Sequence, residues 1–439
     1  MEMPSQMPAE PEVRAQTPLP CRPLPQTFHD LGLPEIFLAN LTLKHCFYMD
    51  IFTLANLGER LKLSTTILTQ LVEYLKKEKF VEVRGPDALR PLASPLSLAL
   101  RHVLTDGGKS RAAQLLEQDA YAGPVPVTLE DYWQQVGQQR IKLTAVSLPR
   151  LRQVFEGLVL SPQMLEQLGP AAVSGRPLFL YGPPGNGKTT IAVRLGEIWD
   201  DPILVPYALY VQGSVIRVFD ENAHGSLKEE AAAMGLEDRR WVRCRRPVVT
   251  VGGELTLAML DLAFNPILKY YEAPLQLKAN NGMFLVDDFG RQQVSPQEML
   301  NRWIVPLENK KDYLCLHAGQ KFTIPFEQFL VFATNLEPRT LVDDAFLRRI
   351  RSKVKVTHIT RDQFKEIFQL VCRTYEVAYD EEAVEYLLAG HYDGGRRHMD
   401  ACHPRDLLEQ ILDYCHFHQI PVTLTPENLD RACRNYFVY

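Results

Sequence analysis

Residues 178–190 read Leu-Phe-Leu-Tyr-Gly-Pro-Pro-Gly-Asn-Gly-Lys-Thr-Thr, and this stretch is the most informative one for the fold. The apolar run 178–181 is typical of a strand, and the apolar residues after Thr190 recur at helical spacing. Between them lies the pattern G-x-x-x-x-G-K-S/T, whose backbone N–H groups form a nest around phosphate oxygens. The sequence therefore predicts a strand, a phosphate-binding loop, and a helix whose N-terminus faces the phosphates.

Two residues of this loop have chemical roles that follow from their side chains. Lys188 is expected to reach the β- and γ-phosphates of a nucleotide, and the Thr189 hydroxyl is expected to ligate Mg²⁺. The other predicted nucleotide contacts are Gly182, Pro183, Pro184, Gly185, Asn186, Gly187 and Thr190. Kinases, GTPases and motor ATPases share such a loop, so it does not decide the reaction.

A second stretch, residues 283–288, reads Met-Phe-Leu-Val-Asp-Asp. A continuous apolar run is typical of a buried parallel strand, and open α/β sheets bind ligands at the carboxyl ends of their strands. Asp287 is therefore the predicted partner of Mg²⁺, acting through water, and Asp288 is predicted to polarise the attacking water.

Further segments resemble motifs of the AAA+ family of ring-forming ATPases, and the motifs follow the family's order over residues 150–439. Residues 329–335 resemble the sensor-1 strand, which implies that Asn335 lies beside the γ-phosphate and orients water. Residues 403–408 resemble the start of the sensor-2 helix, which implies that Arg405 reaches the nucleotide from a helical lid. ATP and Mg²⁺ are the cofactors that the resemblance implies.

Residues 342–351 resemble the segment that carries the family's arginine finger. The resemblance implies Arg348 or Arg349 as the finger, with Arg351 as an alternative. In this family the finger acts on the neighbouring subunit's nucleotide and contributes about 10³–10⁵ in rate. The resemblance therefore implies a homo-hexameric ring. From the residues alone, the simpler interpretation is a solvated arginine pair near a helix end.

The acid pair departs from the family's usual Asp-Glu, because this chain has Asp287-Asp288. The second side chain is one methylene shorter, and a misplacement of about 1 Å can cost on the order of 10²-fold in rate. We therefore expect slow Mg²⁺-dependent turnover, and a scaffold that binds nucleotide without hydrolysis stays an alternative.

The interval between Lys188 and Asp287 is long for a compact core, which predicts an insertion. Residues 275–282 and 313–326 resemble MoxR-like and magnesium-chelatase-like members, and the second stretch predicts a hairpin around Ala318-Gly319. Residues 238–249 carry a basic cluster that we expect on a solvated or interdomain face, with a substrate or nucleic-acid contact as the alternative.

Residues 29–125 resemble a winged-helix domain. Helices are predicted over 34–47, 54–63 and 64–79, followed by strands over 81–84 and 98–104 with a turn at Gly85-Pro86. DNA binding would place the third helix in the major groove. A protein-interaction or assembly role is favoured, because that helix interleaves its lysines with glutamates and offers a weak phosphate footprint.

The predicted fold class is α/β, with a P-loop AAA+ core built on a parallel sheet. The predicted parts are a Pro-rich flexible tail (1–28), a winged-helix-like α+β domain (29–125), linker and approach helices (126–165), the AAA+ core (166–360) and a C-terminal helical lid (361–439). The net charge of −5 indicates no overall basic field. The cysteines follow no C-x-x-C framework and the lid histidines no zinc-ligand spacing, so we expect reduced thiols and no zinc.

No apolar run reaches the roughly 18 residues of a membrane span, so we expect no membrane insertion. The expected reduced thiols predict a cytoplasmic protein. The function that the sequence favours is an AAA+ ATPase that hydrolyses ATP to remodel or assemble a protein client. The alternatives are a regulator that binds DNA through residues 29–125 under ATP control, and the scaffold named above.

Overall fold

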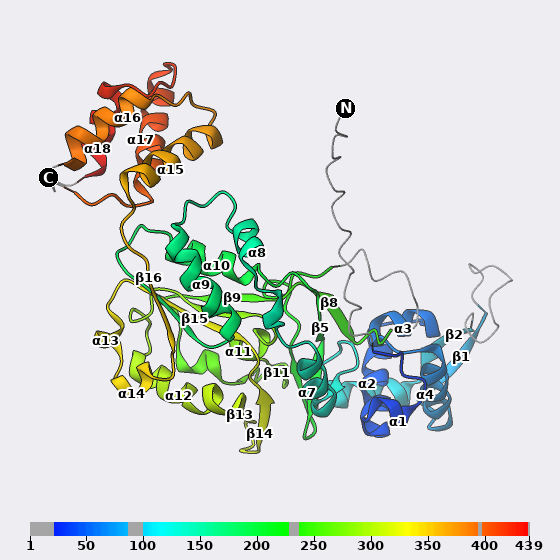
Figure 1. Cartoon of the computed structure of the whole chain (residues 1–439). Coiled ribbons are helices and arrows are strands. Elements are labelled where there is room, and N and C mark those ends of the chain that lie inside the picture. The colour runs from blue at the N-terminus through cyan, green and yellow to red at the C-terminus, as the bar shows by residue number, and fades with distance from the viewer. Residues whose placement is uncertain (1–21, 87–99, 228–236, 394–396, 438–439) are drawn as a thin grey trace, which may run out of the picture.

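The computed structural model describes residues 22–86, 100–227, 237–393 and 397–437 (Figure 1). Most of the predicted Pro-rich tail, residues 1–21, lies outside these ranges. A helical module near the N-terminus and a helical bundle at the C-terminus lie at opposite ends of a central α/β core (Figure 1). The predicted α/β fold class, with a five-stranded parallel sheet and a C-terminal helical bundle, is confirmed.

The apolar run at 178–181 forms β4 (Leu178–Tyr181), an inner strand of a five-stranded sheet. Every pairing in this sheet is parallel, and its order is β16 (Ser352–Lys355), β4, β15 (Phe329–Thr334), β12 (Met283–Val286) and β9 (Val248–Val251). Because β15 separates β4 from β12, the carboxyl ends of these three strands meet at one edge.

Alternation along β4 directs successive side chains to opposite faces of the sheet. Leu178 and Leu180 pack in one apolar cluster with helices α8 (Leu148–Val154), α9 (Pro162–Ser174) and α10 (Lys188–Gly196). Phe179 packs on the other face with α12 (Pro296–Asn309), whose Trp303 is fully buried. The sheet is thus covered on both faces, as its continuous apolar strands predict.

The predicted insertion is present between α10 and β12. In the insertion, β5 (Ile203–Pro206) pairs with β8 (Trp241–Cys244). A second sheet has the order β10 (Ala263–Phe264), β11 (Tyr271–Glu272), β7 (Ser214–Arg217), β6 (Ala208–Val211) and β3 (Val127–Thr128), and its last strand, β3, comes from the segment before the core. The predicted hairpin is also confirmed, as β13 (Lys311–Cys315) pairs antiparallel with β14 (Lys321–Pro325). Hairpin, insertion and helix α7 (Leu129–Gln138) share one apolar cluster.

The basic cluster at 238–249 is largely structural, so the expectation of a solvated face is wrong for two of its arginines. Arg240 is buried and pairs with Asp238 at 2.8 Å, and Arg246 is buried and pairs with Asp201 at 2.7 Å. Buried charges of this kind need partners because desolvation costs several kcal/mol per ion. Arg239 makes an interdomain contact, since its Nη2 lies 2.6 Å from the Glu59 carboxylate.

The N-terminal module contains α1 (Phe28–Leu31), α2 (Glu35–Phe47), α3 (Leu54–Leu61), α4 (Thr65–Lys77), β1 (Val81–Pro86), β2 (Leu100–Leu104) and α6 (Asp106–Gln118). The three predicted helices are present, and the hydroxyl of Ser64 caps α4. The turn predicted at Gly85-Pro86 is wrong, because both residues pair with β2. A register shift between Val83 and Gly85, a β-bulge, lets the strand continue. The winged-helix assignment stays a prediction.

This module packs directly against the insertion. Its apolar cluster includes Ala208 and Val215 of the second sheet, and the rings of Phe37 and Tyr210 lie 4.5 Å apart. His45 on α2 is buried, and its Nε2 donates to the carbonyl oxygen of Gly123 at 2.9 Å. The shared core makes module and insertion one packed unit.

The C-terminal bundle has its own apolar core. Its helices are α15 (Arg361–Thr374), α16 (Glu381–Leu387), a π-turn (Leu388–Tyr392), α17 (His403–His418) and α18 (Pro426–Tyr436). Shorter elements of the chain are α11 (Leu275–Lys278), α13 (Pro338–Leu341), α14 (Asp344–Leu347) and 3₁₀ turns at Leu143–Ala145 and Leu257–Leu260.

Within the described ranges, no three or more metal-ligating side chains gather into a candidate metal site. The cysteines of that part of the chain are free thiols. No helix there has the length and apolar character needed to cross a membrane.

Burial of His45 makes a pH-dependent contribution to stability. Desolvation is the main cause that lowers its pKa from 6.5 to about 4. Between these values the unfolded chain binds the extra proton, so the free energy of unfolding falls as pH falls. We expect wild type to lose about 2 kcal/mol more than His45→Gln between about pH 7 and about pH 5 in urea unfolding. Glutamine keeps an N–H donor and does not titrate, so equal losses would contradict this assignment.

Candidate nucleotide-binding site

The predicted phosphate-binding loop lies between β4 and α10, and Lys188 is folded back onto it. Lys188 Nζ donates to the carbonyl oxygens of Gly182 at 3.0 Å and Pro183 at 2.9 Å. Burial lowers the pKa of Lys188, while the carboxylates of Asp288 and Asp287 act in the opposite direction. A buried ammonium held only by carbonyl oxygens is well placed to exchange them for phosphate oxygens.

Thr189 and Asp287 meet across the edge of the sheet. Thr189 Oγ1 donates to the carboxylate of Asp287, at 2.9 Å from Oδ1 and 2.8 Å from Oδ2. One group comes from the first turn of α10 and the other from the end of β12. A hydroxyl and a carboxylate are hard oxygen donors, so the pair fits Mg²⁺, which is held in proteins by one or two carboxylates plus phosphates and water.

Asp288 and Asn335 form the second polar pair at this edge. Asn335 Nδ2 donates to Asp288 Oδ1 at 3.3 Å, which joins the residue after β15 to the turn after β12. Asp288 is exposed to solvent and has the left-handed backbone angle φ +48°. Both side chains line the same cavity as Lys188.

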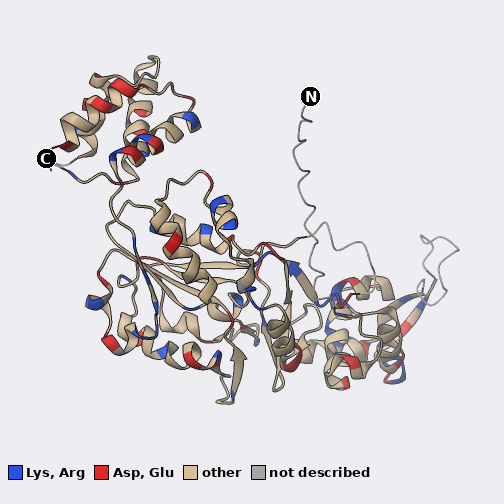
Figure 2. Cartoon of the chain, viewed as in Figure 1, with Lys and Arg blue, Asp and Glu red and all other residues tan. Residues whose placement is uncertain are grey.

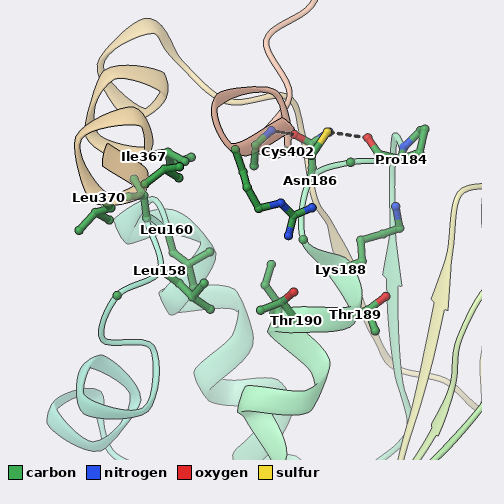
Figure 3. Close-up of a pocket in the computed structure, with 18 of the residues that line it drawn as sticks. Leu158, Leu160, Pro184, Asn186, Lys188, Thr189, Thr190, Ile367, Leu370 and Cys402 are labelled. Atoms are coloured by element: carbon green, nitrogen blue, oxygen red, sulfur yellow. Dashed lines mark hydrogen bonds between the residues drawn. The ribbon is translucent and has the colours of Figure 1, made fainter. Parts of the chain in front are cut away.

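These residues line one cavity of about 630 Å³ together with the lid (Figure 3). The structure brings to it the predicted residues Pro184, Gly185, Asn186, Gly187, Lys188, Thr189, Thr190, Asp287, Asp288, Asn335 and Arg405. Gly182 and Pro183 contribute the carbonyl groups that hold Lys188. The Arg405 guanidinium donates to Asp406 at 3.2 Å, and its side chain is 59% exposed.

The lid docks directly onto the phosphate-binding loop. Asn186 Nδ2 donates to Asp400 Oδ1 at 2.7 Å, and Asn186 Oδ1 accepts from the backbone N–H of Ala401 at 3.1 Å. His358 Nδ1 donates to the same Asp400 oxygen at 2.6 Å. One loop side chain thus binds both the side chain and the backbone of the segment before α17.

A glycine is required where lid and loop approach most closely. The Cys402 N–H donates to the Gly185 carbonyl at 2.9 Å. Gly185 has φ +77°, and a Cβ there would lie 2.7 Å from Cys402 Sγ. A side chain at this position would both strain the backbone and push the lid away.

The other end of the cavity is apolar. Leu158 and Leu160 lie near Ile367 and Leu370 of α15, away from Lys188 (Figure 3). Phe364, Phe368 and Cys372 of α15 are buried in the core of the lid, whereas Ile367 of the same helix lines the cavity. An apolar recess beside a phosphate-binding loop suits the flat ring of a nucleobase.

Arg348 and Arg349, the predicted finger candidates, do not reach this cavity. Arg348 lines a separate pocket with Arg339 and Lys353. Arg349 Nε donates to Glu308 at 2.8 Å. The chain's own cavity is therefore built without them.

Sequence reasoning missed Asp400 and His358. Asp400 lies 214 residues from its partner Asn186, a separation at which spacing along the sequence carries no signal. His358 follows β16 and was not singled out. The local features of this segment are Asp400 itself and the neighbouring His398, Cys402 and His403, and their spacing does not indicate the contact with Asn186.

Comparisons with known proteins bear on the lid and on the fold. Residues 360–435 match the family described as Domain of unknown function (DUF8689). A comparison with curated proteins finds no match. Among solved structures, NtrX from Brucella abortus is 14% identical with a TM-score of 0.41, over 65% of this chain and 57% of that chain.

Two Thermotoga maritima structures are similar in the same way. The Holliday junction branch migration motor RuvB is 12% identical with a TM-score of 0.34, over 66% of this chain and 70% of that chain. Domain III of the replication initiation protein DnaA is 15% identical with a TM-score of 0.36, over 65% of this chain and 97% of that chain. The likeness to these proteins is one of fold alone.

Removal of the Asp400 carboxylate is expected to loosen the lid. Asp400→Ala eliminates the acceptor of Asn186 and His358, and hydrogen bonds to a charged group each contribute about 1.5–3 kcal/mol. We expect the backbone amides of Ala401 and Cys402 to exchange hydrogen about 10- to 100-fold faster, measured by mass spectrometry or NMR. Asp413→Ala, an exposed change on α17, is the matched control. Unchanged exchange in Asp400→Ala would show that the carboxylate does not hold the lid.

Proposed function

We propose that the chain is a Mg²⁺-dependent ATPase. The observation that carries this proposal is the pairing of Thr189 with Asp287, and of Asn335 with Asp288, around one buried lysine. A metal-binding pair and a water-positioning pair are the two requirements of phosphoryl transfer to water. A nucleotide carrier that performs no chemistry would not need the second pair.

Each residue has a distinct role in this reaction. Lys188 exchanges its two carbonyl partners for oxygens of the β- and γ-phosphates, and the backbone N–H groups of the loop hold the rest of the chain of phosphates. Thr189 and Asp287 hold Mg²⁺, which when bound neutralises charge on the phosphates. Asp288 orients the attacking water and accepts hydrogen bonds from it, and Asn335 fixes the Asp288 carboxylate from the side.

The lid completes the site. The recess formed by Leu158, Leu160, Ile367 and Leu370 receives the adenine ring. Arg405 lines the cavity from the start of α17, where its exposed guanidinium can turn from Asp406 toward the γ-phosphate. A change in the nucleotide would then alter the contacts between lid and loop.

The arginine finger is supplied by a neighbouring subunit in this proposal. Arg348 and Arg349 lie outside the chain's own cavity, and Arg348 lines a pocket next to Tyr181 and Glu337. Finger residues that act in trans must project from the subunit surface, which agrees with this placement. The proposed assembly is a homo-hexameric cytoplasmic ring that remodels or assembles a protein client.

A second candidate is a regulator that binds DNA through the N-terminal module. The exposed face of α4, which carries Thr65, Thr66, Thr69 and Gln70, favours it. Against it, Lys76 pairs with Glu73 at 2.9 Å, and basic and acidic residues are mixed over the module (Figure 2). We therefore favour a protein partner, and duplex binding that requires nucleotide would reverse this preference.

The test is phosphate release from ATP measured over a range of protein concentrations. We expect Mg²⁺-dependent release whose specific activity rises with concentration, because the finger belongs to another subunit. Lys188→Ala is the blank, since it removes the ammonium from the phosphate site. Release no faster than this blank would contradict the proposal and favour a nucleotide-binding scaffold.

The same assay tests the finger. Arg348→Ala and Arg349→Ala each keep an intact cavity, and Lys188→Ala keeps both arginines. If one arginine acts in trans, an equal mixture of that variant with Lys188→Ala should release phosphate faster than either protein alone. A mixture no faster than its components would contradict action in trans.

A further inference from the structure

The turn after β12 holds Asp288 in an unusual backbone conformation. Its φ of +48° lies in the left-handed region, which side chains other than glycine, asparagine and aspartate seldom adopt. The sheet ladder ends just before, where the Asp287 N–H donates to the Val251 carbonyl at 2.8 Å. This change of chain direction aims the Asp288 side chain, so whatever fixes the turn also fixes that carboxylate.

One side chain, Gln292, holds the backbone of the turn. Gln292 Nε2 donates to the carbonyl oxygens of Asp287 at 2.8 Å and Asp288 at 3.2 Å. Gln292 Oε1 accepts from the N–H of Gly290 at 2.8 Å. Both halves of the carboxamide are used, which requires a side chain that donates and accepts from one planar group.

The opposite side of the turn is held by β15. The Phe289 N–H donates to the Ala333 carbonyl at 2.7 Å, and Thr334 Oγ1 donates to the Phe289 carbonyl at 2.7 Å. Gly290 has φ +105°, and a Cβ there would lie 2.6 Å from Leu341. The turn is therefore fixed on one side by the strand that leads to Asn335, and on the other by Gln292.

Gln292 lies outside the set of residues that line the cavity. It is half-buried, and its three hydrogen bonds join backbone groups of the turn, so we expect a nucleotide to replace none of them. Its contacts are to the carbonyls of both acids, whereas Thr189 and Asn335 contact the carboxylates. This geometry separates an effect on the position of the acids from an effect on nucleotide affinity.

We propose that Gln292 is a positioning residue for ATP hydrolysis. Gln292 holds the turn in the conformation that lets Asp288 orient water. Asp288 stands where the usual Asp-Glu pair of the AAA+ family has the longer glutamate. This inference rests on the proposed ATPase function. It predicts that hydrolysis depends on Gln292 while nucleotide binding does not.

The experiment compares full-length wild type with Gln292→Ala and Gln292→Glu. For each protein, kcat and KM are measured with Mg²⁺ and ATP, and the Kd for ATPγS is measured by calorimetry. We expect kcat to fall about 10- to 100-fold in Gln292→Ala, because a displacement of about 1 Å has costs of this order. The kcat of Gln292→Glu should fall at least as far, because this change places a carboxylate next to the carbonyl oxygens of Asp287 and Asp288. The Kd should stay within about threefold of wild type.

Gln293→Ala is the matched control, because it is the adjacent exposed glutamine and its backbone bond to Gly253 survives the change. It should keep the kcat of wild type. An unchanged kcat in Gln292→Ala would overturn the positioning role and leave the ATPase proposal intact. A decrease in kcat together with weaker ATPγS binding and a lower Tm would also overturn the positioning role, because the role of Gln292 would then be structural. A wild type no faster than Lys188→Ala would overturn both proposals.

Discussion

Three adjacent parallel strands end at the same edge of the central sheet, and each polar group of the candidate site depends on this. β4 leads into the phosphate-binding loop, β15 leads to Asn335, and β12 leads to Asp287 and Asp288. Because β15 lies between the other two strands, the Asn335 side chain at its end can contact Asp288. The backbone of β15 also supports the turn, since the Ala333 carbonyl accepts from the Phe289 N–H. The apolar packing on both faces of the sheet therefore sets the distances between the charged groups.

The packing also connects distant parts of the chain to this edge. Gln139, just after α7, donates to Asn281 Oδ1 at 3.0 Å and to the Leu204 carbonyl of the insertion at 2.9 Å. Arg246 Nη1 donates to the Asn281 carbonyl at 2.6 Å. Asn281 lies just ahead of β12, so the insertion and α7 are joined through buried polar groups to the strand that carries Asp287. A buried network whose polar groups are bonded favours one arrangement of these elements.

The parts of the site that adjoin strands could be predicted from the sequence. Lys188, Asp287 and Asn335 each follow an apolar run, and the parallel sheet gathers the ends of such runs. The contacts made by the lid could not be predicted, because Asp400 and Asn186 meet only after the helices of the lid have packed. Periodicity also could not separate Ile367, which lines the cavity, from Phe368, which is buried, since both fit the same helical stripe. Arg240 and Arg246 resembled a basic surface, and only their tertiary partners show that they are buried.

The central claim is that loop, acid turn and lid together form one nucleotide site. It is tested most directly by calorimetric titration of the full-length protein with ATPγS, in the presence and absence of Mg²⁺. We expect one nucleotide to bind per chain, more tightly with Mg²⁺, and with an affinity at least about tenfold weaker in Lys188→Ala and in Leu160→Asp. Binding that neither substitution weakens would contradict this site, because the nucleotide would then occupy a different place on the protein.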